Sequence, residues 1–392
     1  MFRDVRYRGV AGRLVEKGEI VRWFAPIMAA APGRGRQLRR TYQSRRRDRI
    51  FARLGQAMPQ WRENPTVRHP KNLSTCSDRP RSEVARRILL ILLVALLASS
   101  AHAGGLTLSP QAQQALDRIY GGDPDGGIAI ARDVERADPQ SPVGFLLEGE
   151  ALWWESYCEA CEIKWGQFDA WHRAKKPEDN AYFALADKAI SLAHDQIATS
   201  DTAEMHVYAG LGYALKARLY SLRDEKRNIA HAGVAGRAEF LRALDLDPDM
   251  ADATAGVGLY NYYIDTLSAI ARMLRFFMGL PGGNKQEGIR QMRVGIEHGA
   301  WMSVDSRFYL ARNLRTYDER YEDALTAAKP LATRYPRNPI FLLLVGNLNA
   351  ELGRNAKAEE YFHAAENSQT PDAACAARAR EVAASVLASG GR

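Results

Sequence analysis

The residues with the clearest chemical potential are two cysteines three positions apart, Cys158 and Cys161. Thioredoxin-like redox activity requires a βαβ context, which the flanking sequence does not show, and haem attachment requires a histidine where Glu162 stands. A zinc site would need two further ligands, and only His172 lies nearby. We therefore predict a local disulfide between Cys158 and Cys161 in an oxidising compartment, with inert thiols and metal binding as open alternatives. Cys375 is predicted to be an unpaired, small apolar residue.

Aromatic residues gather around this cysteine pair. They are Trp153, Trp154, Tyr157, Trp165, Phe168 and Trp171. Aromatic faces suit the stacking of a sugar or another ligand. The alternative, which we favour, is that these side chains pack a long insert at residues 155–179 against neighbouring helices.

No catalytic constellation emerges from the sequence. There is no G-x-S-x-G, no H-E-x-x-H and no phosphate-binding loop. The histidines after residue 103 are scattered, at His172, His194, His206, His231, His298 and His363. Scattered helical histidines are usually surface or packing residues. The sequence therefore predicts neither an enzyme nor a cofactor.

An unusually apolar segment occupies residues 267–283. Its apolar residues cover two helical faces, formed by Leu267, Ile270, Leu274, Phe277 and Met278 and by Met273, Phe276 and Leu280. Only Ser268, Arg272 and Arg275 interrupt them with polar groups. A surface that wide must be sandwiched by neighbouring helices, cover a lipid or touch a membrane. We favour sandwiching, and keep lipid or membrane contact as the alternative.

The net charge of +8 is unevenly distributed. Residues 1–103 carry 22 of the 54 Lys and Arg and 7 of the 46 Asp and Glu. The remaining residues therefore carry a small acidic excess. A nucleic-acid partner, which the overall basic balance would suggest, is not expected for this acidic part.

The first 103 residues divide into an Arg-rich stretch, 1–83, and a signal-like stretch, 84–103. The first stretch has no apolar periodicity, which favours a disordered extension or upstream sequence that is not translated. In the second, Arg86 and Arg87 precede the apolar run 88–98 and an A-x-A site at 101–103. This order is typical of a secretory signal peptide. It predicts an exported, periplasmic protein whose mature chain starts at Gly104, with a membrane-anchored form as the alternative.

From Leu106 onward the apolar periodicity is helical, with almost no strand signal. We predict six helix pairs, at 110–136, 142–198, 205–248, 251–302, 305–336 and 338–371, followed by a cap helix at 372–388. The third and fourth pairs carry 12 and 18 residues more than the last pair. These pairs group into 104–200 with the aromatic and cysteine insert, 201–302 with long arms, and the regular 303–392.

The last pair, Asn338 to Pro371, resembles a tetratricopeptide repeat (TPR). Counting Pro339 as position 1, Gly346 stands at position 8, and Ala358, Phe362 and Ala365 stand at positions 20, 24 and 27. Small residues there let two helices approach closely, and the aromatic residue fills the space towards the next pair. The chain is similar to exported bacterial TPR proteins of unassigned role. This resemblance implies an all-α solenoid of antiparallel helix pairs that acts as a protein-binding scaffold.

The resemblance also implies a concave groove lined by first-helix positions 2, 5, 9, 12 and 13. In the last three pairs these positions hold Asp252, Tyr262, Tyr263, Tyr309, Asn313, Thr316, Tyr317 and Asn347. Asn313 and Asn347 occupy the same position in successive pairs. Because an amide both donates and accepts, it can bind the backbone of an extended peptide of any sequence. The sequence thus predicts a protein or peptide partner held in this groove.

Overall fold

The computed structural model describes residues 105–267 and 281–388. All of them belong to one unit, Leu96–Arg392. The Arg-rich stretch 1–83 and the signal-like stretch 84–103 lie outside the described residues. So does nearly all of the apolar segment 267–283.

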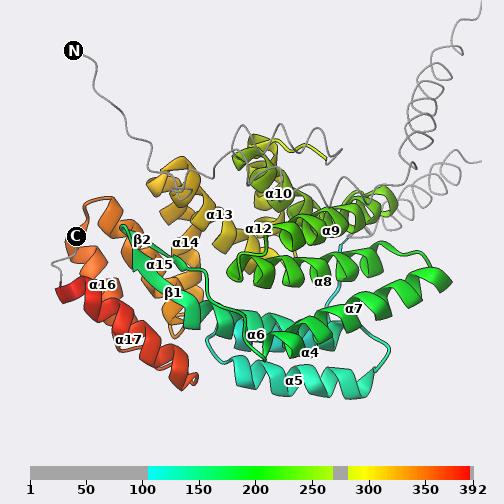
Figure 1. The fold of residues 1–392 in the computed structure, drawn as a ribbon, viewed down its shortest axis with the longest axis horizontal. Helices are drawn as coiled ribbons and strands as arrows, with labels where there is room; N and C mark the ends of the chain where they lie inside the picture. Colours follow the sequence, from blue (N-terminus) through cyan, green and yellow to red (C-terminus); the bar gives the residue numbers. More distant parts are fainter. Residues whose placement is uncertain (1–104, 268–280, 389–392) are drawn as a thin grey trace, which may run out of the picture. The chain divides into compact units, whose positions relative to one another are not determined.

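The described chain is built almost entirely from helices (Figure 1). In chain order these are α4 (Pro110–Tyr120), α5 (Pro124–Ala137), α6 (Val143–Ala160), α7 (Asp179–Thr199), α8 (Ala203–Leu222), α9 (Lys226–Leu246), α10 (Ala251–Thr266), α12 (Lys285–His298), α13 (Ser303–Asp318), α14 (Tyr321–Arg334), α15 (Pro339–Glu351), α16 (Asn355–Glu366) and α17 (Ala373–Ala388). The prediction of a predominantly α-helical protein is confirmed.

Local sequence signals explain where several helices begin. Side-chain oxygens cap the first turns of six of them, from Ser109, Asp123, Thr202, Asn284, Asn338 and Asp372. These residue types satisfy backbone N–H groups that have no partner inside the helix. Proline follows the cap directly at α4, α5 and α15, where its missing N–H carries no penalty.

Consecutive helices pack on one another along the chain, including α8 with α9, α10 with α12, α13 with α14 and α15 with α16. Glycines allow the closest approaches. A Cβ on Gly288 would lie 2.6 Å from the carbonyl oxygen of Gly258, and one on Gly346 would lie 3.1 Å from the ring of Phe362. The small residues that the sequence pattern singled out at these positions therefore lie where two helices of a pair touch.

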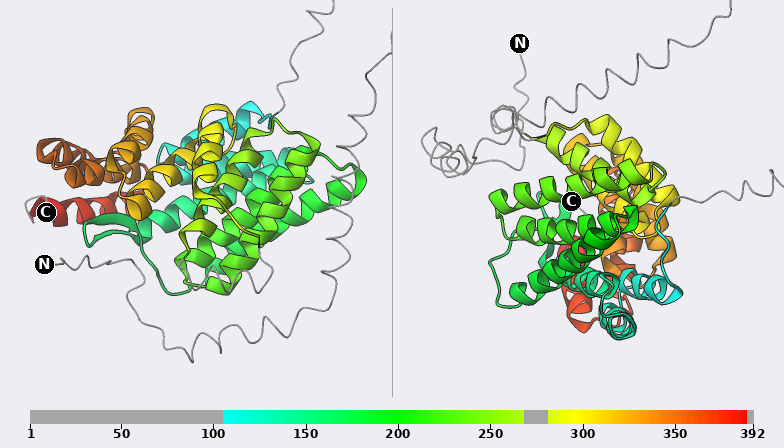
Figure 2. Two further views of the ribbon diagram at one scale, coloured as in Figure 1. Left: turned by 90° about the horizontal axis from the view of Figure 1, so that it is seen from above. Right: turned by 90° about the vertical axis from the view of Figure 1, so that its right-hand side faces the viewer.

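The first described helices also contact the last ones (Figures 1 and 2), because α17 packs on α6. Tyr335 Oη donates to Asp117 of α4 at 2.9 Å, and Asn338 Nδ2 donates to the carbonyl oxygen of Tyr120 at 2.9 Å. In an open solenoid each repeat contacts only its neighbours. The described helices depart from that expectation, since α4 and α6 contact α14, α15 and α17.

An aromatic cluster forms the centre of these long-range contacts. The ring of Trp154 on α6 lies 5.0 Å from Phe308 of α13, 5.4 Å from Phe341 of α15 and 5.9 Å from Tyr120 of α4. All four side chains are buried. Such large apolar groups contribute most of the core energy.

The insert between α6 and α7 contains a feature that the sequence did not predict. Strands β1 (Cys161–Lys164) and β2 (Gln167–Ala170) pair antiparallel as a hairpin. Strand β1 contacts α17 and β2 contacts α15 and α6, and Figure 2 shows the hairpin beside α17. The interpretation that the insert packs against neighbouring helices is confirmed for Trp153, Trp154, Tyr157 and Phe168, which are buried.

Candidate functional site

The predicted groove residues do not line an open surface. Five of the eight are buried: Asp252, Tyr262, Tyr309, Asn313 and Asn347. The expectation of a solvent-accessible groove at these positions is therefore wrong. The physical reason is that helices from both ends of the chain, together with the β1–β2 hairpin, cover the faces that an open solenoid would leave free.

Asn347 on α15 binds the backbone of strand β2 with both ends of its amide. Its Nδ2 donates to the carbonyl oxygen of Gly166 at 2.7 Å, and its Oδ1 accepts from the N–H of Phe168 at 3.1 Å. Arg315 Nη1 donates to the same Oδ1 at 3.0 Å, which fixes the orientation of the amide. Asn347 thus binds the backbone of this chain's own hairpin, at the turn residue Gly166 and at Phe168 of β2, whereas the sequence predicted that it binds the backbone of a partner peptide.

A charged contact holds Asp169, the hairpin residue that follows Phe168. Arg312 Nε donates to the two carboxylate oxygens of Asp169 at 2.7 and 2.9 Å, and Tyr157 Oη donates to Oδ1 at 3.1 Å. Arg315 lies 3.8 Å from the same carboxylate. Burial raises the pKa of Tyr157 well above its usual range, so its hydroxyl remains a donor. We call α13 and α15 with Arg312, Arg315 and Asn347 the hairpin seat.

The other predicted groove residues have structural contacts. Asp252 accepts from the N–H groups of Ala300, Trp301 and Met302, and thereby fixes the turn before α13. Tyr262 Oη donates to the carbonyl oxygen of Asn313 at 3.0 Å. These contacts explain why the residues are polar without requiring a ligand.

Asn313 does not make the contacts that its equivalent repeat position to Asn347 led us to expect. The Asn313 side chain makes no hydrogen bond of ordinary geometry within the described ranges, so it does not match Asn347. Tyr263 Oη accepts from Arg312 at 3.0 Å, and Thr316 Oγ1 accepts from Arg315 at 3.3 Å. Tyr317 alone among the eight is strongly exposed, at 45%.

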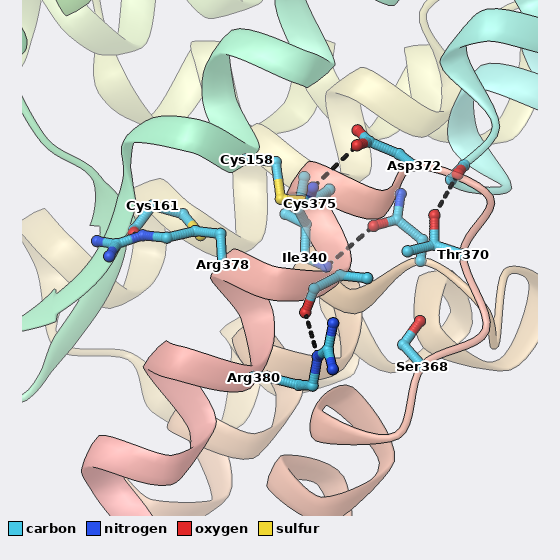
Figure 3. Close-up of a disulfide and its surroundings, with 12 residues drawn as sticks. Cys158, Cys161, Ile340, Ser368, Thr370, Asp372, Cys375, Arg378 and Arg380 are labelled. Carbon is cyan, nitrogen blue, oxygen red and sulfur yellow. Dashed lines mark hydrogen bonds between the residues drawn. A yellow bond between two sulfur atoms is a disulfide. The ribbon is translucent and has the colours of Figure 1, made fainter.

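The cysteine pairing differs from the prediction. Cys158 on α6 forms a disulfide with Cys375 on α17, with their Cα atoms 5.5 Å apart, while Cys161 is a buried free thiol (Figure 3). The predicted Cys158–Cys161 disulfide and the unpaired Cys375 are therefore wrong. The physical reason is that α6 continues to Ala160, while α17 brings Cys375 beside Cys158 from the far end of the chain.

The free thiol of Cys161 is poorly suited to chemistry. Burial raises its pKa to about 12, against the opposing effect of Arg378, whose Nε donates to the Cys161 carbonyl oxygen at 2.8 Å (Figure 3). The nucleophilic thiolate is therefore scarce at neutral pH.

The turn of the hairpin carries an exposed tryptophan in an unfavourable conformation. Trp165 has φ 52° and Gly166 has φ 80°, as in the two-residue turns that favour Asn-Gly. A left-handed conformation costs an L-residue about 1–2 kcal/mol. Even so, 82% of Trp165 is exposed, and its ring meets Trp171 edge-on at 5.2 Å. Packing into the core therefore does not explain a tryptophan at this position.

A buried ionic network joins three helices and was missed by the sequence reading. Arg218 of α8 donates to Glu150 of α6 at 2.8 and 2.9 Å and also to Asp305 of α13, and Trp154 Nε1 donates to Glu150 at 2.9 Å. All three charged groups are buried. The sequence feature that could have revealed this network is a charged residue on an apolar helical face, because Glu150 follows Leu146 and Leu147 by one helical turn.

This network predicts a stability that depends on pH. Burial raises the pKa of Glu150 from 4.5 to about 7, against the effect of Arg218 and with the help of Asp305. Because the folded state binds the proton more tightly than the unfolded state, this group makes stability fall as pH rises from about 4.5 to 7. We expect Glu150→Gln, which mimics the protonated acid, to match the wild type near pH 5 and to be more stable by about 3 kcal/mol at pH 8.

Urea denaturation across this pH range measures the difference. Glu148→Gln, on the same helix as Glu150, removes a surface pair with Arg132 of α5, whose side chain is 57% exposed; it is the control and should give a nearly constant offset. A wild-type minus Glu150→Gln difference that does not change with pH would contradict the assignment.

Within the described ranges, no group of three or more His, Cys, Asp and Glu side chains is arranged to hold a metal ion. None of the described helices combines the length and apolarity required to cross a bilayer. Surface hollows of about 340 Å³ lie beside Asp117, one towards Arg334 and Tyr335 and one along α4. Neither is lined by the hairpin seat.

No protein-family model matches the chain, and no curated protein is detectably similar to it.

Proposed function

We propose that this protein is an exported, periplasmic scaffold of the TPR type that binds a protein partner through the hairpin seat. The observation that carries the proposal is the pair of hydrogen bonds from the Asn347 amide to the backbone at Gly166 and Phe168. On the hairpin side these bonds involve only backbone atoms, so they would also hold a segment of another protein that presents the same backbone conformation. The chain's own β2 occupies the seat, and a partner segment would replace it.

Two features support export. The order of basic residues, apolar run and A-x-A site in 84–103 is that of a cleaved leader. The disulfide between Cys158 and Cys375 suits an oxidising compartment, because such bonds persist outside the reducing cytosol.

The repeat assignment is supported by close contact within helix pairs. Gly258 and Gly288 let α10 and α12 touch, and Gly346 and Phe362 do the same for α15 and α16. These positions correspond to the small and aromatic positions of the repeat. A solenoid of antiparallel pairs, closed by contacts between its ends, would account for them.

A synthetic peptide of residues 160–171 tests the seat directly. Phe168 is 1% exposed, and Phe168→Ala should loosen the bound hairpin by a few kcal/mol. Because occupancy by the chain's own segment lowers apparent affinity, we expect the variant to bind the labelled peptide at least about tenfold more tightly than the wild type. Fluorescence anisotropy with the full chain gives the two affinities.

Two further variants make the test specific. Adding Asn347→Ala to Phe168→Ala should abolish the gain, because the backbone contacts are lost. Phe183→Ala is the control. It removes an aromatic ring of α7 whose centre lies 4.6 Å from that of Tyr220, and it should leave peptide binding at the wild-type level. Failure of Phe168→Ala to bind the peptide would contradict the proposal. In-cell crosslinking followed by mass spectrometry would then identify the natural partner of the wild type.

A further inference from the structure

We infer that the tip of the β1–β2 hairpin is a docking point for an anionic membrane surface. The tip consists of the exposed indole of Trp165, the half-buried indole of Trp171 and the cations of Lys164, Arg173 and Arg378 around Glu162. This inference does not rest on partner binding at the hairpin seat, although Asn347 of the seat contacts Gly166 of the same turn.

The conformation of the turn is the first support. Trp165 has a positive φ where Asn or Gly would be unstrained, and 82% of it faces solvent. Strain of this kind persists where the surrounding structure or a function requires it. Because the indole does not pack in the core, we look for the reason for a tryptophan at this position in a contact outside the described chain.

The shape of the tip indicates the kind of partner. Small-molecule sites are concave, and the surface hollows beside Asp117 are lined by other residues. Trp165 instead stands at the apex of a two-residue turn between Lys164 and Gln167. An indole that projects from an apex suits the headgroup region of a bilayer, where tryptophan can bury its ring and keep its N–H in contact with water.

The charges at the tip favour an anionic surface. Lys164, Arg173 and Arg378 lie 3.1, 3.3 and 3.6 Å from the single carboxylate of Glu162. Burial acts to raise the pKa of Glu162, but Lys164 and Arg173 together lower it. Lys164 Nζ also lies 5.6 Å from the centre of the Trp171 ring. Cations beside a half-buried indole, next to the exposed Trp165, match the combination of anionic headgroups and an interface.

Few other exposed apolar residues neighbour the hairpin tip in sequence. The other strongly exposed large apolar residues in the described ranges, Leu246, Leu267, Val294 and Tyr317, are not next to the hairpin tip in sequence. A stable protein interface buries about 800 Å² on each partner. Two indoles cover far less, whereas shallow insertion into a bilayer needs only a few side chains.

The test uses the full chain and vesicles of phosphatidylcholine with phosphatidylglycerol. We expect the wild type to co-sediment with these vesicles and not with pure phosphatidylcholine. Brominated lipids should quench its tryptophan fluorescence. Trp165→Asn suits the turn better, so it should melt no lower than the wild type and yet bind at least about fivefold more weakly. Lys164→Glu should weaken binding by a similar factor and make the remaining binding less sensitive to salt, because less of it is electrostatic.

Tyr317→Ser is the matched control, because it removes another exposed aromatic side chain away from the turn and should bind as the wild type does. Equal vesicle binding by the wild type and Trp165→Asn would overturn the inference. So would binding that does not depend on anionic lipid, or a Trp165-dependent affinity for soluble oligosaccharides or for a protein in place of vesicles.

Discussion

Arg218→Met is expected to lower the free energy of unfolding by about 3–5 kcal/mol at neutral pH. The substitution keeps most of the side-chain volume but leaves the buried carboxylates of Glu150 and Asp305 without their shared cation. Removing one member of a buried ionic group is costly, because the remaining charges stay in a poorly solvated place. Urea denaturation of the full chain measures the loss.

Lys216→Met is the control on the same helix, because Lys216 pairs with Asp187, whose side chain is 58% exposed. Its loss should cost no more than about 1 kcal/mol. The loss of stability caused by Arg218→Met should also be smaller at acidic pH, where the carboxyl groups of Glu150 and Asp305, left without their cation, can take up protons. Equal effects of the two substitutions would show that the network does not hold α6, α8 and α13 together.

Loss of the Cys158–Cys375 disulfide is expected to lower the free energy of unfolding by about 5 kcal/mol, since it closes a loop of 217 residues in the unfolded chain. The double variant Cys158→Ala with Cys375→Ala prevents a new pairing with Cys161. Denaturation of this variant beside the oxidised wild type gives the difference. Cys161→Ala keeps the tether and should cost about 1 kcal/mol.

Peptide mapping of the unreduced protein by mass spectrometry decides the pairing itself. A linked peptide pair containing Cys158 and Cys375 is expected. A linked Cys158–Cys161 peptide, or quantitative alkylation of Cys375 without reduction, would contradict the structure and favour the local pairing that the sequence suggested.

The disulfide and the network have a common consequence for the hairpin seat. Both tie α6 to distant helices, through α17 in one case and through α8 and α13 in the other. Since α13 carries Arg312 and Arg315, the position of the seat depends on α6. We therefore expect variants of Arg218 to weaken binding of the 160–171 peptide as well as stability.

The sequence by itself determined the helices and their close contacts. The first predicted pair, 110–136, corresponds to α4 (Pro110–Tyr120) and α5 (Pro124–Ala137). Gly346 and Phe362 touch as the repeat pattern required, because the periodicity of a helix places these residues on one face. The amide of Asn347 was singled out for binding a partner's backbone, and in the structure it binds backbone of the chain's own hairpin.

Only the tertiary structure decided what covers each helix face. Local periodicity shows that a face is buried, but it does not say which distant segment buries it. The Cys158–Cys375 bond, the occupation of Asn347 by the chain's own β2 and the neutralisation of Glu150 by Arg218 all join segments that are far apart in sequence. The contacts between α4–α6 and α14–α17 bring these segments together, and no nearest-neighbour repeat pattern contains them.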